Sequence, residues 1–165
     1  MFGASCYTFT MQKITPFLWF DKNLKEIVDF YSSVFPDTKI LNKGDLSDTP
    51  SGEVEIVTIE ILGQELSLMT AGPMFKFNES ISFVVTCEDQ KEIDYYWNAL
   101  TNNGGEESQC GWCKDKYGLW WQIVPTVMTT MMASGNKEKI GRVTQAFLKM
   151  KKFDIQTLTD TFEKE

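Results

Sequence analysis

The 165-residue chain contains no histidine. This absence excludes a His-based catalytic triad, a His general base and a His metal ligand. Positive charge is also in short supply, with 16 Lys and Arg against 23 Asp and Glu and a net charge of −7. Nucleic-acid binders usually carry an excess of basic residues, so the sequence argues against that class. No apolar run approaches the length of about 18 residues that a membrane helix needs, which argues against a membrane partner.

Cysteine is scarce, and the four residues present are too few for a disulfide scaffold at this length. Cys110 and Cys113 form a Cys-x-x-Cys pair, which is a redox site where it opens a helix whose N-terminus lowers a thiol pKa. Here residues 115–118 predict a turn into a strand, so this helix is missing. A zinc site would need two more thiolates at matching spacing, and the other two cysteines lack it. We interpret the pair as incidental thiols near a strand end.

The first eleven residues differ in pattern from the rest of the chain. They lack a basic segment, and Gly3, Ser5 and Thr8 interrupt their apolar residues, so they do not read as a secretory signal. We expect residues 1–11 to be loosely ordered or an upstream extension. Together with the low cysteine content, this pattern predicts a cytoplasmic protein.

The remaining chain is rich in core-forming residues, with five Trp and twelve Phe. The first half predicts the order strand, helix, strand, strand, strand, because helical spacing of apolar residues is followed by alternation. Asp21 to Asn23 are expected to cap the helix, and Pro36-Asp37 to end it. The expected elements are a strand at 13–20, a helix from 24 to 35, a strand at 38–43, a polar loop at 44–52, and hairpin strands at 53–62 and 65–70.

The second half repeats this order as strand, helix, strand, strand, with room for one more short strand. Asp89 and Glu92 form a capping pattern at the start of a helix that ends at Gly104. Strands are expected at 81–87, 107–113 and 119–124, with a turn at 115–118 between the last two. Such a repeat within one compact chain predicts two modules that pack as one unit. We place this paired domain at 12–125, with modules at about 12–71 and 79–125.

The segment 126–165 is helical by the same criteria. A Met-rich helix at 126–134 is followed by helices that Asn136 and Asp154 cap. Helices this short cannot bury their own apolar stripes. They must therefore pack on the sheet domain or on a second subunit.

Three passages of this sequence are similar to one protein family. The chain resembles the PhnB-like branch of the vicinal oxygen chelate superfamily, the glyoxalase and bleomycin-resistance fold. Members of this branch often carry the label 3-demethylubiquinone-9 3-methyltransferase. The passages are Ile14-Thr15-Pro16-Phe17-Leu18-Trp19-Phe20 with Phe30-Tyr31 and Val34-Phe35; Gly111-Trp112 with Asp115-Lys116-Tyr117-Gly118 and Trp121-Gln122-Ile123-Val124-Pro125; and Arg142-Val143-Thr144-Gln145-Ala146-Phe147 with Met150 and Asp154-Ile155.

The resemblance implies an α+β fold of two βαβββ modules, each with a curved sheet, followed by C-terminal helices. It also implies a homodimer, with modules paired within one chain or across subunits, and a cleft between half-barrels.

Metal-dependent members of the superfamily hold a divalent ion on side chains from both modules. The corresponding positions here fall near Pro16, Ser82 and Gln122, with Ser67 or Met69 as a fourth. Proline has no ligating side chain, and Ser and Gln are weak neutral ligands. We therefore expect neither a metal nor another cofactor.

An aromatic face with one amide is suited to holding an organic ligand. Trp120 is interpreted either as a pocket wall or as a core residue, whereas Trp97 and Trp121 are expected in the core. The expected ligand is a small hydrophobic or aromatic molecule. The expected cleft residues are Leu18, Phe20, Ser67, Met69, Ser82, Trp112, Trp120 and Gln122.

Three alternatives remain open at this stage. One is a lyase, isomerase or dioxygenase of the same superfamily with atypical metal ligands such as Gln122. Another is an interaction module whose helical tail recruits a protein. The methyltransferase activity of the family label lacks support, because the sequence has no Gly-x-Gly after a first strand to bind a methyl donor of the usual kind.

Overall fold

The computed structural model describes residues 12–164, and the expectation for residues 1–11 lies outside this range. The chain divides into two compact units, of which the first ends at Phe75 and the second begins at Lys76. Each unit is described by itself. No helix within residues 12–164 is both long enough and apolar enough to cross a membrane.

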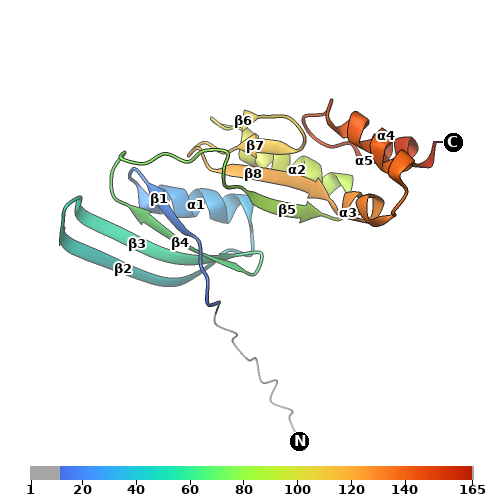
Figure 1. The fold of residues 1–165 in the computed structure, drawn as a ribbon. Helices are drawn as coiled ribbons and strands as arrows, with labels where there is room; N and C mark the ends of the chain where they lie inside the picture. The colour runs from blue at the N-terminus through green and yellow to red at the C-terminus, as the bar shows by residue number, and fades with distance from the viewer. Residues whose placement is uncertain (1–11, 165) are drawn as a thin grey trace, which may run out of the picture. The chain divides into compact units, whose positions relative to one another are not determined.

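The first unit is a four-stranded sheet with one helix (Figure 1). The strand order is β1-β4-β3-β2, in which β1 runs parallel to β4 and the other neighbours are antiparallel. Its elements are β1 (Phe17–Phe20), α1 (Leu24–Val34), β2 (Lys39–Thr49), β3 (Gly52–Ile61) and β4 (Gln64–Thr70).

The core of this unit lies between α1 and one face of the sheet. Period-two alternation along β3 and β4 places one set of apolar residues on this face, and helical spacing does the same along α1. Removing a side chain of this size from water contributes ~1.5–3 kcal/mol. The buried residues include Leu18, Phe20, Ile27, Tyr31, Val57, Ile59, Leu66 and Leu68.

The second unit repeats the first one element by element. Its sheet has the order β5-β8-β7-β6, with the single parallel pair again at β5 and β8. This arrangement confirms the predicted α+β class and the two βαβββ modules. The elements are β5 (Phe83–Cys87), α2 (Gln90–Thr101), β6 (Glu106–Glu107), β7 (Trp112–Lys114) and β8 (Trp120–Pro125).

Three further helices complete the second unit: α3 (Thr126–Ala133), α4 (Lys137–Phe147) and α5 (Ile155–Glu163). The predicted caps of α4 and α5 are confirmed, because Asn136 accepts a hydrogen bond from the Lys139 backbone N–H and Asp154 from that of Thr157. The segment after α4 docks on the sheet, where Phe153 is buried. The tail therefore packs on the sheet domain of its own chain.

Two predicted boundaries are wrong. The expected polar loop at 44–52 is the end of β2 and its turn into β3, with Gly44 opposite Ile56 and Leu46 opposite Val54. Strand β2 lies at the sheet edge, so nearly all of its side chains are exposed, and its sequence shows no alternation of apolar and polar residues. The expected strand at 107–113 is interrupted, because Cys110 and Gly111 both adopt positive φ values of 59° and 78° between β6 and β7.

The first helix also begins differently from the prediction. Asn23 is the N-cap residue, but it lies in the left-handed region with φ 61° and makes no side-chain cap bond. Its side-chain amide instead donates to Glu26 at 3.4 Å.

Candidate functional site

The face of the second sheet turned away from its buried residues carries several large half-exposed side chains, and we call it the second open face. Val84 on β5 lies opposite Gln122 on β8, and Gln122 lies opposite Trp112 on β7, so the three form one row across the sheet. In the neighbouring row, Lys114 on β7 lies opposite Trp120 on β8. These five residues define the second open face.

An aromatic pair dominates this face. The rings of Trp112 and Trp120 meet edge to face, with their centroids 6.3 Å apart. The ammonium group of Lys114 lies 5.7 Å from the centre of a Trp120 ring, within the range of a cation–π contact. Lys114 also forms an ion pair with Glu106 at 2.8 Å. The face therefore combines aromatic surface with one positive charge.

The polar part of the second open face is an amide–hydroxyl pair. Gln122 donates from Nε2 to Oγ of Ser82 at 2.8 Å. Within residues 12–164, the Gln122 oxygen has no hydrogen-bond partner. The structure therefore brings together Ser82, Trp112, Trp120 and Gln122 of the predicted cleft residues.

Ser67 and Met69 lie on the corresponding face of the first unit. Phe17 and Ser67 are opposite each other on β1 and β4, and so are Trp19 and Met69. The hydroxyl groups of Ser67 and Thr58 are hydrogen-bonded at 3.2 Å. This face is half-exposed and mixed in polarity.

Leu18 and Phe20 do not belong to an open face. Their side chains are 6% and 4% exposed, and the Phe20 ring packs against Tyr31 of α1 at 6.4 Å. Strand alternation turns both side chains toward α1, so they are not among the predicted cleft residues that the open faces bring together. The sequence reasoning missed Trp19 between them, although the same alternation could have found it.

Trp19 is held firmly in place. Its indole N–H donates to the Gly72 carbonyl at 2.7 Å, and its ring meets Phe75 edge to face at 5.0 Å. The sequence reasoning also missed Lys114 and Val84, which follow from the strand registers rather than from any motif.

The positions that a metal would occupy do not fit a divalent ion. Gln122 and Ser82 are neutral and already bonded to each other, and Ser67 is bonded to Thr58. Pro16 supplies no side-chain donor. No three His, Cys, Asp or Glu side chains converge anywhere in residues 12–164. The donor set therefore lacks the carboxylates, imidazoles or thiolates that such ions prefer.

The Asp115-Lys116-Tyr117-Gly118 turn has a structural explanation. Asp115 is buried, and its carboxylate accepts hydrogen bonds from the backbone N–H groups of Tyr117 and Leu119 and from the indole of Trp121 at 2.9 Å. The carboxylate thus fixes the turn and the core Trp121. The expected core positions of Trp97 and Trp121 are confirmed, with 1% and 3% exposure.

Cys110 and Cys113 are both free thiols. Burial raises the pKa of Cys113 to about 12, with Asp115 and then Glu107 adding to the rise. A thiol of this kind is unreactive at neutral pH, because the thiolate is the nucleophile. No helix begins at this pair, since β7 follows directly. The interpretation as incidental thiols fits this geometry.

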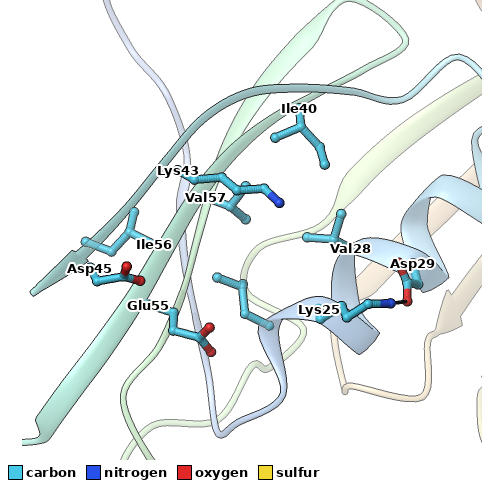
Figure 2. A pocket seen from close by; sticks show the side chains of 10 residues that line it. Lys25, Val28, Asp29, Ile40, Lys43, Asp45, Glu55, Ile56 and Val57 are labelled. Atoms are coloured by element: carbon cyan, nitrogen blue, oxygen red, sulfur yellow. Dashed lines mark hydrogen bonds and ion pairs between the residues drawn. The ribbon is translucent and has the colours of Figure 1, made fainter.

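A groove of about 210 Å³ lies in the first unit between α1 and the outer strands (Figure 2). Apolar residues such as Val28, Ile40 and Val57 line it, and charged side chains surround them. Lys25 and Asp29 of α1 form an ion pair at 2.5 Å on one side. The sequence reasoning missed this groove, because it needs the part of β2 that was expected as a loop.

Comparisons with known proteins agree with this fold. A family model described as 3-demethylubiquinone-9 3-methyltransferase matches residues 12–124. A search of the curated proteins finds no match.

Among solved structures, a putative 3-demethylubiquinone-9 3-methyltransferase, PhnB protein, from Bacillus cereus is 28% identical with a TM-score of 0.61, over 70% of this chain and all of that one. Protein PA1353 from Pseudomonas aeruginosa is 17% identical with a TM-score of 0.54, over 69% of this chain and 97% of that one. The fosfomycin resistance protein FosX from Listeria monocytogenes is 13% identical with a TM-score of 0.55, over 73% of this chain and 96% of that one. The last two are similar in fold alone.

The family match extends over both βαβββ modules, and the repeated strand order is that of the glyoxalase and bleomycin-resistance fold. The chain therefore belongs to the 3-demethylubiquinone-9 3-methyltransferase family, the PhnB-like branch of the vicinal oxygen chelate superfamily.

Proposed function

We propose that the protein is a metal-free, homodimeric binder of a small hydrophobic or aromatic molecule, and that the ligand lies on the second open face. The observation that carries the proposal is the half-exposed Trp112–Trp120 pair beside the Gln122 amide. Ligand sites are mostly apolar with a few placed polar groups, and this face has that composition.

Each group on the face has a role in the proposal. The indole rings supply aromatic surface for stacking, and the exposed Val84 extends the apolar area. The free oxygen of Gln122 accepts a hydrogen bond from a ligand donor. Lys114 favours a ligand whose negative group replaces Glu106 as its ion-pair partner, since its ammonium lies beside the Trp120 ring.

We do not propose the methyltransferase activity named in the family description. The segment that joins β1 to α1 is Asp21-Lys22-Asn23, which contains no glycine for a turn against a methyl donor. An enzyme with a metal on Gln122 and Ser82 is also unsupported, because both side chains are weak neutral ligands.

The first test of the proposal is binding of the fluorescent anion 1-anilinonaphthalene-8-sulfonate. We expect the wild-type protein to bind it and Trp120→Ala to raise the Kd at least tenfold, since one aromatic contact is worth ~0.5–1.5 kcal/mol beyond its buried area. Tyr95→Ala is the matched control, because Tyr95 is an exposed aromatic residue on α2. An equal effect of both variants, or no binding by the wild type, would remove the assignment.

The metal-free part of the proposal has its own test. Elemental analysis of the purified protein is combined with thermal melts in Zn²⁺, Ni²⁺, Mn²⁺ and Mg²⁺, because a ligand of the folded state must raise the Tm. We expect no stoichiometric metal and no specific shift. A stabilising shift that Gln122→Ala abolishes would instead favour the enzyme.

A further inference from the structure

Strand β2 is an open edge of the first sheet. In the order β1-β4-β3-β2 it pairs on one side only, and ten of its eleven residues are exposed. Ile40, Leu41 and Leu46 are between 41% and 51% exposed. An edge of this length presents unpaired N–H and C=O groups that can template another strand, unless charge or irregularity prevents it.

The charges along this edge are unbalanced within the unit. Asp45 on β2 lies directly opposite Glu55 on β3, and both line the groove (Figure 2). Like charges in directly opposite positions destabilise a sheet. Lys43 lies on the same face two residues before Asp45. Within residues 12–164, none of these three side chains forms an ion pair.

The part of β2 that pairs regularly with β3 is short and is centred on one residue. Its pairing with β3 is irregular between Ile40 and Asn42 and again between Leu46 and Thr49. The stretch from Asn42 to Leu46 is therefore the straight part of the edge, and Gly44 is its central residue. A Cβ built at Gly44 would meet nothing within 4 Å, so the backbone there is open to approach.

We propose that β2 pairs antiparallel with β2 of a second copy of this chain, about a two-fold axis at Gly44. This inference rests on the homodimer of the proposed function and names its contact surface. In this register Lys43 of each copy lies opposite Asp45 of the other, because the two residues are equidistant from the axis. Each pairing of Lys43 with Asp45 offsets the repulsion between that Asp45 and Glu55.

The charge pattern selects this register over its neighbours. Residues that lie directly opposite each other in an antiparallel pair project from the same face of the sheet. The two-fold axis of a symmetric pairing must therefore pass through a residue of β2, and the neighbouring registers place it at Lys43 or at Asp45. A shift one way centres the pairing on Lys43 and places two lysines opposite each other. A shift the other way centres it on Asp45 and places two aspartates opposite each other. The pairing at Gly44 is favoured over both.

The structure leaves room for this contact within the first unit. Helix α1 contacts β3 and β4, and β3 is the only strand that pairs with β2 within the sheet of this unit. The regular stretch is short, and stable interfaces usually bury more than about 1,000 Å². We therefore expect a weak dimer whose population rises with protein concentration.

The test is a charge swap measured by sedimentation velocity over a concentration series. Lys43→Asp and Asp45→Lys are each expected to raise the dimer Kd at least tenfold, because each places like charges opposite each other twice. The double variant K43D/D45K is expected to return to within about threefold of the wild type, since it restores both pairs with reversed sign. Lys91→Asp on α2 is the control for charge alone, and far-UV circular dichroism checks folding.

The outcomes separate this inference from the proposed function. A dimer that the single reversals leave intact, or a double variant that stays dissociated, overturns the β2 contact while homodimerisation stands. A wild type that is monomeric at every concentration overturns both the contact and the homodimer. The dye measurement on Trp120→Ala decides ligand binding in either case.

Discussion

Gly111 lies where the segment after α4 packs closely on the sheet of the second unit. A Cβ at this position would lie 2.5 Å from Cε2 of Phe153 and 2.9 Å from the carbonyl oxygen of Ile123, and φ is +78°. We expect Gly111→Ala to lower the free energy of unfolding by ~2–4 kcal/mol, because overpacking adds to the cost of a left-handed alanine. Urea denaturation measures the change.

Gly118 provides the matched control at the residue scale. It has a similar φ of +88°, but a Cβ there would meet nothing within 4 Å. Gly118→Ala should therefore lower the free energy of unfolding only by the cost of a left-handed alanine, ~1–2 kcal/mol. Equal losses for the two variants would show that the approach of Phe153 does not limit position 111.

The aromatic residues show how far single positions could be predicted. The core positions of Trp97 and Trp121 followed from apolar periodicity, and burial confirms them. Leu18 and Phe20 were assigned to a cleft, although alternation along β1 turns them inward and Trp19 outward. Composition alone could not decide this, because all three side chains are large and apolar. The face that each residue takes is set by its register with β4, in which Leu18 lies opposite the buried Leu68.

At the scale of elements, Gln90 of α2 bridges to the tail through two hydrogen bonds to its backbone. Its amide donates to the Phe153 carbonyl at 3.1 Å, and its oxygen accepts from the Ile155 backbone N–H at 2.9 Å. We expect Gln90→Ala to destabilise the protein by ~1–3 kcal/mol, because both backbone groups lose their partner. The measurement is again denaturation in urea.

Lys91→Ala is the neighbouring control, since Lys91 is exposed on the same helix. A surface substitution of this kind usually changes stability by less than about 0.5 kcal/mol. If Gln90→Ala behaved like Lys91→Ala, the other contacts of the tail, such as the ion pair between Lys152 and Asp94, would hold it without this bridge.

Elements were predicted best where local chemistry defines them. The caps at Asp89, Asn136 and Asp154 each accept the expected backbone hydrogen bond, because a capping side chain acts within three residues. Strand β2 was cut short at 43, because an exposed edge strand owes its structure to pairing with β3 and leaves no apolar pattern. The groove and the second open face depend on such pairings, so neither could be derived in full from the sequence.

At the scale of the whole molecule, the two units are joined by a segment without helix or strand at residues 71–82. Lys76 lies within it and is exposed. We expect trypsin to cut at Lys76 before it cuts the lysines of the helices and strands, because proteases prefer exposed irregular chain. Mass spectrometry of a time course identifies the first products.

Lys76→Gln should remove this early cleavage without changing the later pattern. If early cuts instead appeared within α4 or β2, those elements would open more readily than the joining segment.

The parallel pair at the edge of each sheet has a consequence for synthesis of the chain. Within its module, strand β1 leaves the ribosome before the other strands, yet it pairs only with β4, the last of them. The strands β2, β3 and β4 pair with their neighbours in sequence and can form early. Strand β1 can pair only after the chain between β1 and β4 has closed into a long loop. The first module can thus be complete once Thr70 has emerged from the ribosome. In the second module, β5 likewise cannot pair until β8 has been synthesised.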